Sequence, residues 1–142
     1  MIGKGHSGAL VTIVERVTKL TVNNKSAEDV TQATIALLKP FEDVVHTITA
    51  DNGKVFAYHE RISKELSSEV YFAHPYSSWE RGLNENTNGL LRQYFPKNTD
   101  FKKVEQLKVA QALRRLNSRP KKDLDFKTPA QLMNDHRAAL AA

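Results

Sequence analysis

The sequence has no cysteine and no long hydrophobic run, and each absence excludes a class of protein. Without cysteine, a disulfide scaffold and a cysteine-ligated zinc site are both excluded. No apolar run approaches the ~20 residues of a membrane-spanning helix. The amino-terminal segment also has no hydrophobic stretch ahead of a cleavage site. We therefore expect no membrane partner and no signal peptide.

Two common ligand-binding patterns are also missing. None of the five histidines pairs with another at a spacing of three or four residues, so the sequence predicts no helical histidine metal site. The segment Gly3-Lys4-Gly5 lacks the spacing and the following Ser or Thr of a phosphate-binding loop. Neither pattern therefore predicts a metal or phosphate site.

What is present is an ordinary globular composition with an uneven charge. Of the 142 residues, 26% are charged and 40% hydrophobic, which excludes wholesale disorder and favours a single domain over 1–142. Residues 1–90 hold 9 Lys or Arg and 11 Asp or Glu, whereas residues 91–142 hold 12 and 5. Clustered cations displace counterions from phosphates, so the basic half suits a nucleic acid, although it is equally a charged, solvated surface.

The hydrophobic pattern predicts an α/β fold with a mixed sheet flanked by helices. We expect strands first, then alternating helices and strands, and finally only helices. The expected strands are 9–17, 20–22, 44–50 and 70–73, and the expected helices are 26–38, 56–66, 83–95, 103–117 and one that starts at 128–129.

Local signals refine three of these elements. Ser26 is predicted to cap the first helix, and Thr128, Pro129 and Gln131 form a capping-box pattern at the start of the last one. The β-branched run 44–50 suggests a strand buried on both faces.

Asp51 directly follows that predicted strand and is a candidate metal ligand. Binding groups in open α/β sheets gather beyond the carboxyl ends of strands. The alternative is structural, because Asp51-Asn52-Gly53 is also a good turn sequence.

A second polar group is predicted on one helix face. Glu85, Asn88 and Arg92 lie three and four residues apart in turn, so their side chains share a face. An acid, an amide and an arginine in line suit a metal and a phosphate, although a polar face is usually only solvated.

The segment before it, AHPYSSWERGLNEN, is too polar for a core and too aromatic for a plain linker. Aromatic, arginine and amide side chains are those that nucleic-acid surfaces use for stacking and phosphate contact. Otherwise it is a surface loop with Trp79 tucked into the core. We expect DNA contacts from this segment, from the helix after it and from the basic carboxyl-terminal part: Arg81, Asn84, Asn88, Arg92, Arg114, Arg115, Lys121 and Lys122.

Three stretches together resemble a known family. ITADNGKVFAYHE, VYFAHPYSSWERGLNENTNGLLRQYFPK and LNSRPKKDLDFKTPAQL are similar to the catalytic core of insertion sequence 30 family transposases. The resemblance implies a ribonuclease-H-like fold and a cytoplasmic bacterial enzyme that acts on double-stranded DNA, with a possible homo-oligomer.

The resemblance also implies a site. The family uses an Asp, Asp, Glu triad to hold two Mg²⁺ (or Mn²⁺) ions. Asp51 matches the second aspartate, Glu85 matches the glutamate after 33 intervening residues, and Arg92 matches a basic residue expected to contact DNA. Two such cations clamp the attacking and leaving oxygens of a phosphoryl displacement. The implied reactions are strand cleavage and strand transfer.

The chain departs from this pattern at its amino-terminal end. The family's first aspartate would fall about two residues before Met1. Most of the family's first strand would also lie before Met1. We therefore expect unpaired backbone groups on the two strands that would flank the missing one. We also expect little or no transposition chemistry from this chain. Val55 stands where relatives often carry glutamate, which we cannot explain. The alternatives are a non-catalytic DNA-binding or regulatory remnant and a ribonuclease-H-like nuclease.

Overall fold

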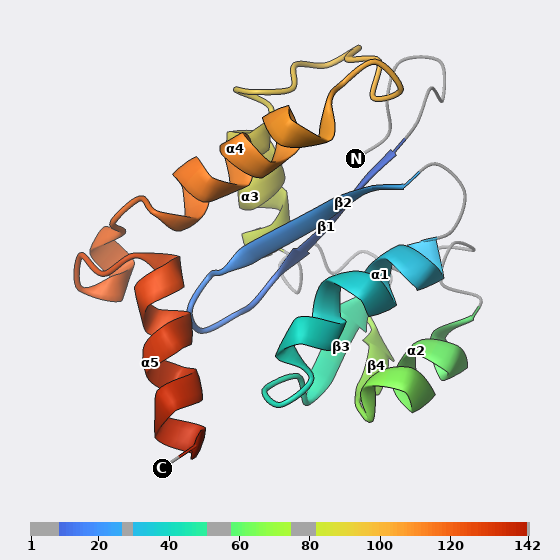
Figure 1. Ribbon diagram of the computed structural model, residues 1–142, viewed down its shortest axis with the longest axis vertical. Coiled ribbons are helices and arrows are strands. Elements are labelled where there is room, and N and C mark those ends of the chain that lie inside the picture. The colour runs from blue at the N-terminus through green and yellow to red at the C-terminus, as the bar shows by residue number, and fades with distance from the viewer. Residues whose placement is uncertain (1–8, 27–29, 51–57, 75–81, 142) are drawn as a thin grey trace.

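The computed structural model describes residues 9–26, 30–50, 58–74 and 82–141 (Figure 1). Its elements follow the predicted order of strands and helices. They are β1 (Ala9–Val14), β2 (Thr21–Ser26), α1 (Val30–Leu38), η2 (Lys39–Phe41), β3 (Thr47–Ala50), α2 (His59–Leu66), β4 (Glu69–Phe72), α3 (Gly82–Leu91), α4 (Gln106–Asn117), η5 (Lys122–Leu124) and α5 (Pro129–Ala141).

β1 and β2 form an antiparallel hairpin whose register runs from Ala9 opposite Ser26 to Val14 opposite Thr21. The Glu15 carboxylate organises the turn, because it accepts hydrogen bonds from the Val17 amide at 2.9 Å and the Thr18 amide at 2.5 Å. The predicted strands 9–17 and 20–22 implied a turn close to this place, although β1 ends earlier, at Val14. Ser26, the predicted helix cap, pairs with Ala9 at the end of β2, and the residues between it and α1 lie outside the described ranges.

β3 and β4 pair in parallel, from Thr47 opposite Glu69 to Ala50 opposite Phe72, and α2 lies between them in the chain. The predicted strand at 44–50 starts too early. The amides of Val44 and Val45 bond to the Phe41 carbonyl and so continue the η2 turn.

Burial of β3 on both faces is also wrong. Thr47 and Thr49 are exposed, whereas Ile48 is half-buried and packs against the cluster beneath α1 and α2. One covered face is therefore enough to account for this β-branched run.

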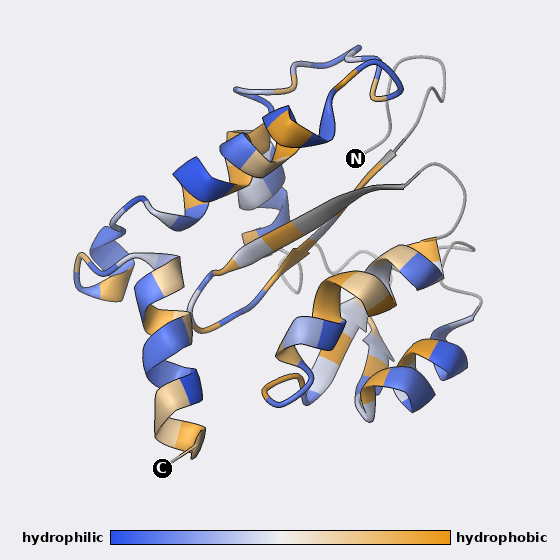
Figure 2. Ribbon diagram, viewed as in Figure 1, coloured by the Kyte–Doolittle hydropathy of each residue, from blue (hydrophilic) through white to orange (hydrophobic). Residues whose placement is uncertain are grey.

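Two hydrophobic clusters lie on opposite faces of the β1–β2 hairpin, as the alternation of side chains along a strand requires. Leu10 belongs to one cluster, which α3 and α4 complete, and Ile13 packs against the other, which α1 and α2 complete. In Figure 2, α3 and α4 lie on one side of the hairpin, and α1 and α2 lie on the other. The first cluster comprises Leu10, Leu91, Phe95, Phe101, Val109, Ala112 and Leu116. The second centres on Leu38, Ile62 and Leu66, with Ile13, Val22, Ile35, Val45, Ile48 and Val70 around them.

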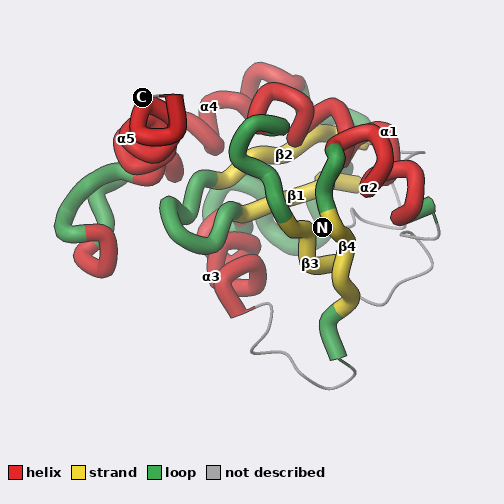
Figure 3. The backbone as a smooth tube through the Cα atoms, turned by 90° about the horizontal axis from the view of Figure 1, so that it is seen from below, coloured by secondary structure: helices red, strands yellow, loops and turns green. Residues whose placement is uncertain are grey.

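The expected mixed sheet is present in two parts. β1–β2 is antiparallel and β3–β4 is parallel, and within the described ranges no strand pairs β1 with β3 (Figure 3). Ile13 and Ile48 nevertheless pack against the same cluster, so the two sheets share one core.

The last helix begins as predicted. Pro129 is its first residue, the Gln131 amide donates to Thr128 Oγ1 at 3.2 Å, and the Gln131 side chain accepts from the Thr128 amide at 2.9 Å. The capping box is therefore confirmed. No helix in the described part of the chain is long and apolar enough to cross a membrane.

Candidate nucleic-acid and metal site

Two of the predicted site residues, Asp51 and Arg81, lie outside the described residues. The residue before Asp51, Ala50, belongs to the described residues. Ala50 is the last residue of β3, is buried, and pairs with Phe72 of β4. Asp51 therefore follows the carboxyl end of a parallel pair, as the sequence predicted.

Glu85 lies in the first turn of α3 and is exposed. The first turn of a helix exposes unsatisfied backbone amides and the positive end of the helix dipole, which favours a carboxylate there. Glu85 is therefore an accessible acid on an element that packs against β1.

Asn84 and Asn88 tie α3 to that strand. Asn84 Nδ2 donates to the Thr12 carbonyl at 3.3 Å, and Asn88 Nδ2 donates to Asn84 Oδ1 at 2.9 Å. The Glu15 amide bonds to the Leu20 carbonyl across the hairpin. Peptide groups of successive residues point to alternate sides of a strand, so the carbonyl of Thr12, three residues earlier, points away from β2. Asn84 thus supplies a donor to a strand edge and orients the turn that carries Glu85.

Two buried oxygens in this region have no hydrogen-bond partner among the described residues. They are Thr12 Oγ1 and Asn88 Oδ1. An unsatisfied buried polar atom costs free energy, so it marks a place where a further group is needed. Asn88 Oδ1 lies one helical turn from Glu85, on the face that the sequence predicted to be functional.

Arg92 follows the end of α3, where Nη1 donates to the carbonyls of Phe95 at 3.5 Å and Pro96 at 3.4 Å. These carbonyls close the turn after the helix. The guanidinium is half-buried and retains further donors for an anion.

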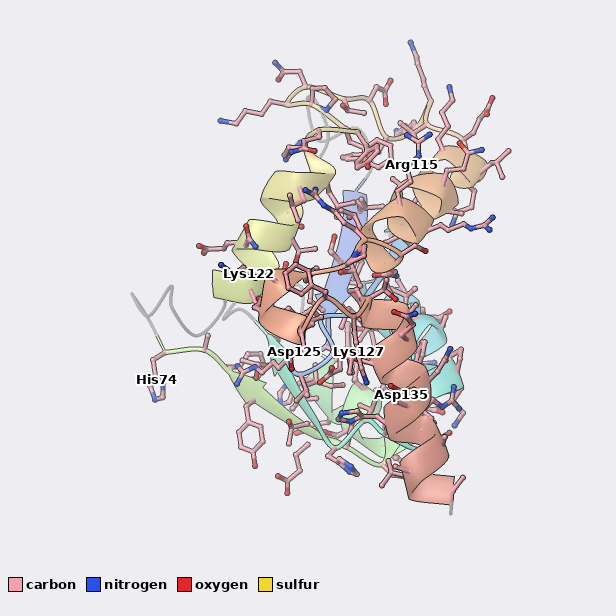
Figure 4. The ribbon with its side chains drawn as sticks, turned by 90° about the vertical axis from the view of Figure 1, so that its left-hand side faces the viewer. His74, Arg115, Lys122, Asp125, Lys127 and Asp135 are labelled. Carbon is pink, nitrogen blue, oxygen red and sulfur yellow. The ribbon has the colours of Figure 1, made fainter. Side chains whose placement is uncertain are left out.

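The carboxyl-terminal candidates form a basic surface on α4 and on the loop that follows it. Arg114 and Arg115 are exposed and line a shallow open hollow with Gln111 and Ser118. Lys122 is exposed and Lys121 is half-buried. Figure 4 shows Arg115 and Lys122 on the same side of the molecule, on α4 and on η5.

Sequence reasoning missed Asn117, which anchors α4 to β2. Its Oδ1 accepts from the Thr21 amide at 2.9 Å and its Nδ2 donates to the Thr21 carbonyl at 2.7 Å, so the side-chain amide takes the place of a strand peptide group. The only signal was an amide at the end of a predicted helix.

The residues present fit a hard divalent cation by their chemistry. Asp51, Glu85 and the unsatisfied Asn88 Oδ1 supply oxygens only, which Mg²⁺ and Mn²⁺ prefer. Within the described ranges, which omit Asp51, no group of three or more acids or histidines gathers to hold a metal.

Comparisons with solved structures define the class of the fold. The catalytic core domain of BIV integrase matches 99% of this chain and 93% of its own, with a TM-score of 0.72 and 16% identity. A chain of the simian T-cell lymphotropic virus intasome, solved in complex with PP2A regulatory subunit B56 gamma, matches 92% of this chain and 50% of its own, with a TM-score of 0.70 and 19% identity. The chain therefore has the ribonuclease-H-like fold of retroviral integrase cores.

Curated relatives then give the family. The transposase for insertion sequence element IS4351 of Bacteroides fragilis is 43% identical over all of this chain, and the transposase InsI of IS30A of Escherichia coli is 37% identical over 87% of it. The chain is thus a homologue of the insertion sequence 30 family transposases over most of its length. It spans 46% of the first relative and 34% of the second. No family model matches.

Proposed function

We propose that residues 1–142 form one catalytic-core domain of a DNA transposase, with Asp51 and Glu85 as metal-binding carboxylates. The observation that carries the proposal is the placement of Glu85. It is an exposed acid in the first turn of α3, on a helix that Asn84 bonds directly to β1. The sequence similarity to transposases and the fold of integrase cores support the same reading.

The proposed role of each residue follows from its chemistry. Asp51 and Glu85 would hold Mg²⁺ or Mn²⁺, which supplies Lewis acidity to a phosphodiester when bound. Asn84 holds α3 on β1 and so positions Glu85, and Arg92 offers donors for a DNA phosphate near the end of α3.

Metal binding by the chain tests this proposal. Titration with Mn²⁺, followed by the paramagnetic resonance signal of the free ion, should show a site that Asp51→Asn or Glu85→Gln weakens. Glu60→Gln is the matched control, because Glu60 is an exposed acid in the first turn of α2. Equal Mn²⁺ binding by the wild type and both site variants would exclude the assignment.

The basic surface favours a second candidate function, DNA binding without catalysis. Arg114, Arg115 and Lys122 are exposed on the half of the chain that carries the excess of cations. Such a chain should bind duplex DNA with an affinity that falls steeply as salt rises, because phosphate contacts release counterions. Fluorescence anisotropy with a labelled duplex measures this, and salt-independent binding would argue against it.

A further inference from the structure

The loop between α4 and α5 is closed by its own backbone. The Lys121 amide donates to the Lys127 carbonyl at 3.2 Å, and the amides of Leu124 and Phe126 both donate to the Lys121 carbonyl at 3.0 Å. These bonds hold residues 121–127 in a compact turn, so its shape does not depend on side-chain packing at the tip.

Two residues at this tip have left-handed backbone. Asp125 has φ 50° and Phe126 has φ 60°. For a bulky side chain this conformation is unfavourable, by about 1–2 kcal/mol. Burial of the ring does not offset the cost, because Phe126 is 71% exposed. Strain of this kind persists where the surrounding structure imposes it, and it is concentrated at binding sites.

The turn and its base carry more cations than acids, with Asp123 and Asp125 as the two acids of the turn. Lys19, at the β1–β2 turn, forms an ion pair with Asp123 of η5, so the two turns lie side by side. Partial burial lowers the pKa of Lys121, and the nearby charges of Lys19 and Arg119 lower it further. Figure 4 shows that Lys122, Asp125 and Lys127 also belong to this region. A half-buried ammonium that faces other cations favours a bound anion.

We propose that this turn is a DNA contact in which Phe126 stacks on an exposed nucleobase while Lys121, Lys19 and Arg119 hold the adjacent phosphate. The proposal rests on the proposed DNA-binding function and adds an aromatic contact to it. Charge complementarity selects DNA as the occupant, since an exposed aromatic residue in a turn with an excess of cations matches a base and its phosphate.

Anisotropy titrations with a fluorescein-labelled duplex that ends in a single-stranded overhang test the contact. Phe126→Leu keeps an apolar side chain but removes the ring, so the affinity should fall at least about fivefold with an unchanged salt dependence. Phe126→Tyr keeps the ring and should bind like the wild type. Leu140→Ala, an equally exposed residue (66%) on α5, is the control that should change nothing.

The phosphate contact is tested in the same titration. Lys121→Met should weaken binding and reduce the slope of log affinity against log salt by about one, whereas Lys64→Met on α2 should leave it unchanged. Wild-type affinity in Phe126→Leu would overturn the stacking contact, and an unchanged slope in Lys121→Met would overturn the phosphate contact. Failure of the wild-type chain to bind any DNA would instead overturn the proposed function.

Discussion

Asn117→Ala should destabilise the fold far more than a residue at the end of a helix usually does. Its side-chain amide forms two hydrogen bonds with the buried residue Thr21, at 2.9 and 2.7 Å, on the edge of β2 that faces away from β1. Alanine removes both bonds and leaves the Thr21 amide and carbonyl unsatisfied. Each lost bond of this kind costs about 1–2 kcal/mol, so the free energy of unfolding should fall by about 2–4 kcal/mol.

Helix propensity works against this effect and therefore sharpens the test. Alanine is a better helix former than asparagine by up to about 0.7 kcal/mol, so any destabilisation must come from the lost bonds to β2. Asn117→Asp should cost at least as much as alanine. It keeps the acceptor for the Thr21 amide but places a second oxygen opposite the Thr21 carbonyl.

Urea unfolding followed by circular dichroism measures the change. With a slope of about 1.5 kcal/mol per molar urea, a loss of 3 kcal/mol lowers the midpoint by about 2 M. Gln111→Ala, on an exposed position of the same helix, is the control and should shift the midpoint little. A loss below about 0.5 kcal/mol in Asn117→Ala would refute the view that this amide completes the strand edge.

Two further predictions concern turns. Burial alone would raise the pKa of Glu15, but hydrogen bonds from the Thr18 hydroxyl and from nearby amides outweigh it and lower the pKa below its usual 4.5. The stabilisation is therefore complete above the unfolded pKa and is lost as pH falls through the folded pKa. Glu15→Gln should cost about 1 kcal/mol at pH 7 and less near pH 3, and a cost in urea unfolding that grows at low pH would contradict this. Asp125→Gly should raise the free energy of unfolding by about 0.5–1 kcal/mol, because glycine adopts left-handed backbone without strain. Asp135→Gly inside α5 should lower the free energy of unfolding, and destabilisation by Asp125→Gly would contradict the strain at this turn.

The elements that the sequence predicted well are those with local causes. The capping box at Thr128 and Gln131 depends on side chains three residues apart, and the turn at Thr18 depends on Glu15, three residues before it. Such interactions form within one turn of chain and leave a signal in the sequence. The order of strands and helices was therefore predictable.

The failures depend on contacts that are distant in the chain. β2 extends to Ser26 by pairing with Ala9, beyond the predicted strand 20–22. Asn117 bonds to a residue 96 positions away, and no local pattern identifies Thr21 as its partner. Asn84 bonds to the Thr12 carbonyl, 72 positions away, which no local pattern identifies, and its DNA contact stays a prediction. Long-range pairing decided each of these cases.

The central claim is that Asp51 and Glu85 are two carboxylates of a transposase site. The most direct measurement is the joining of transposon ends to target DNA by a chimaera, in which residues 1–142 replace the matching 46% of the Bacteroides fragilis transposase. We expect the chimaera to join ends with Mg²⁺, and Asp51→Asn and Glu85→Gln each to abolish joining while Glu60→Gln leaves it intact. Joining retained by either site variant would contradict the claim.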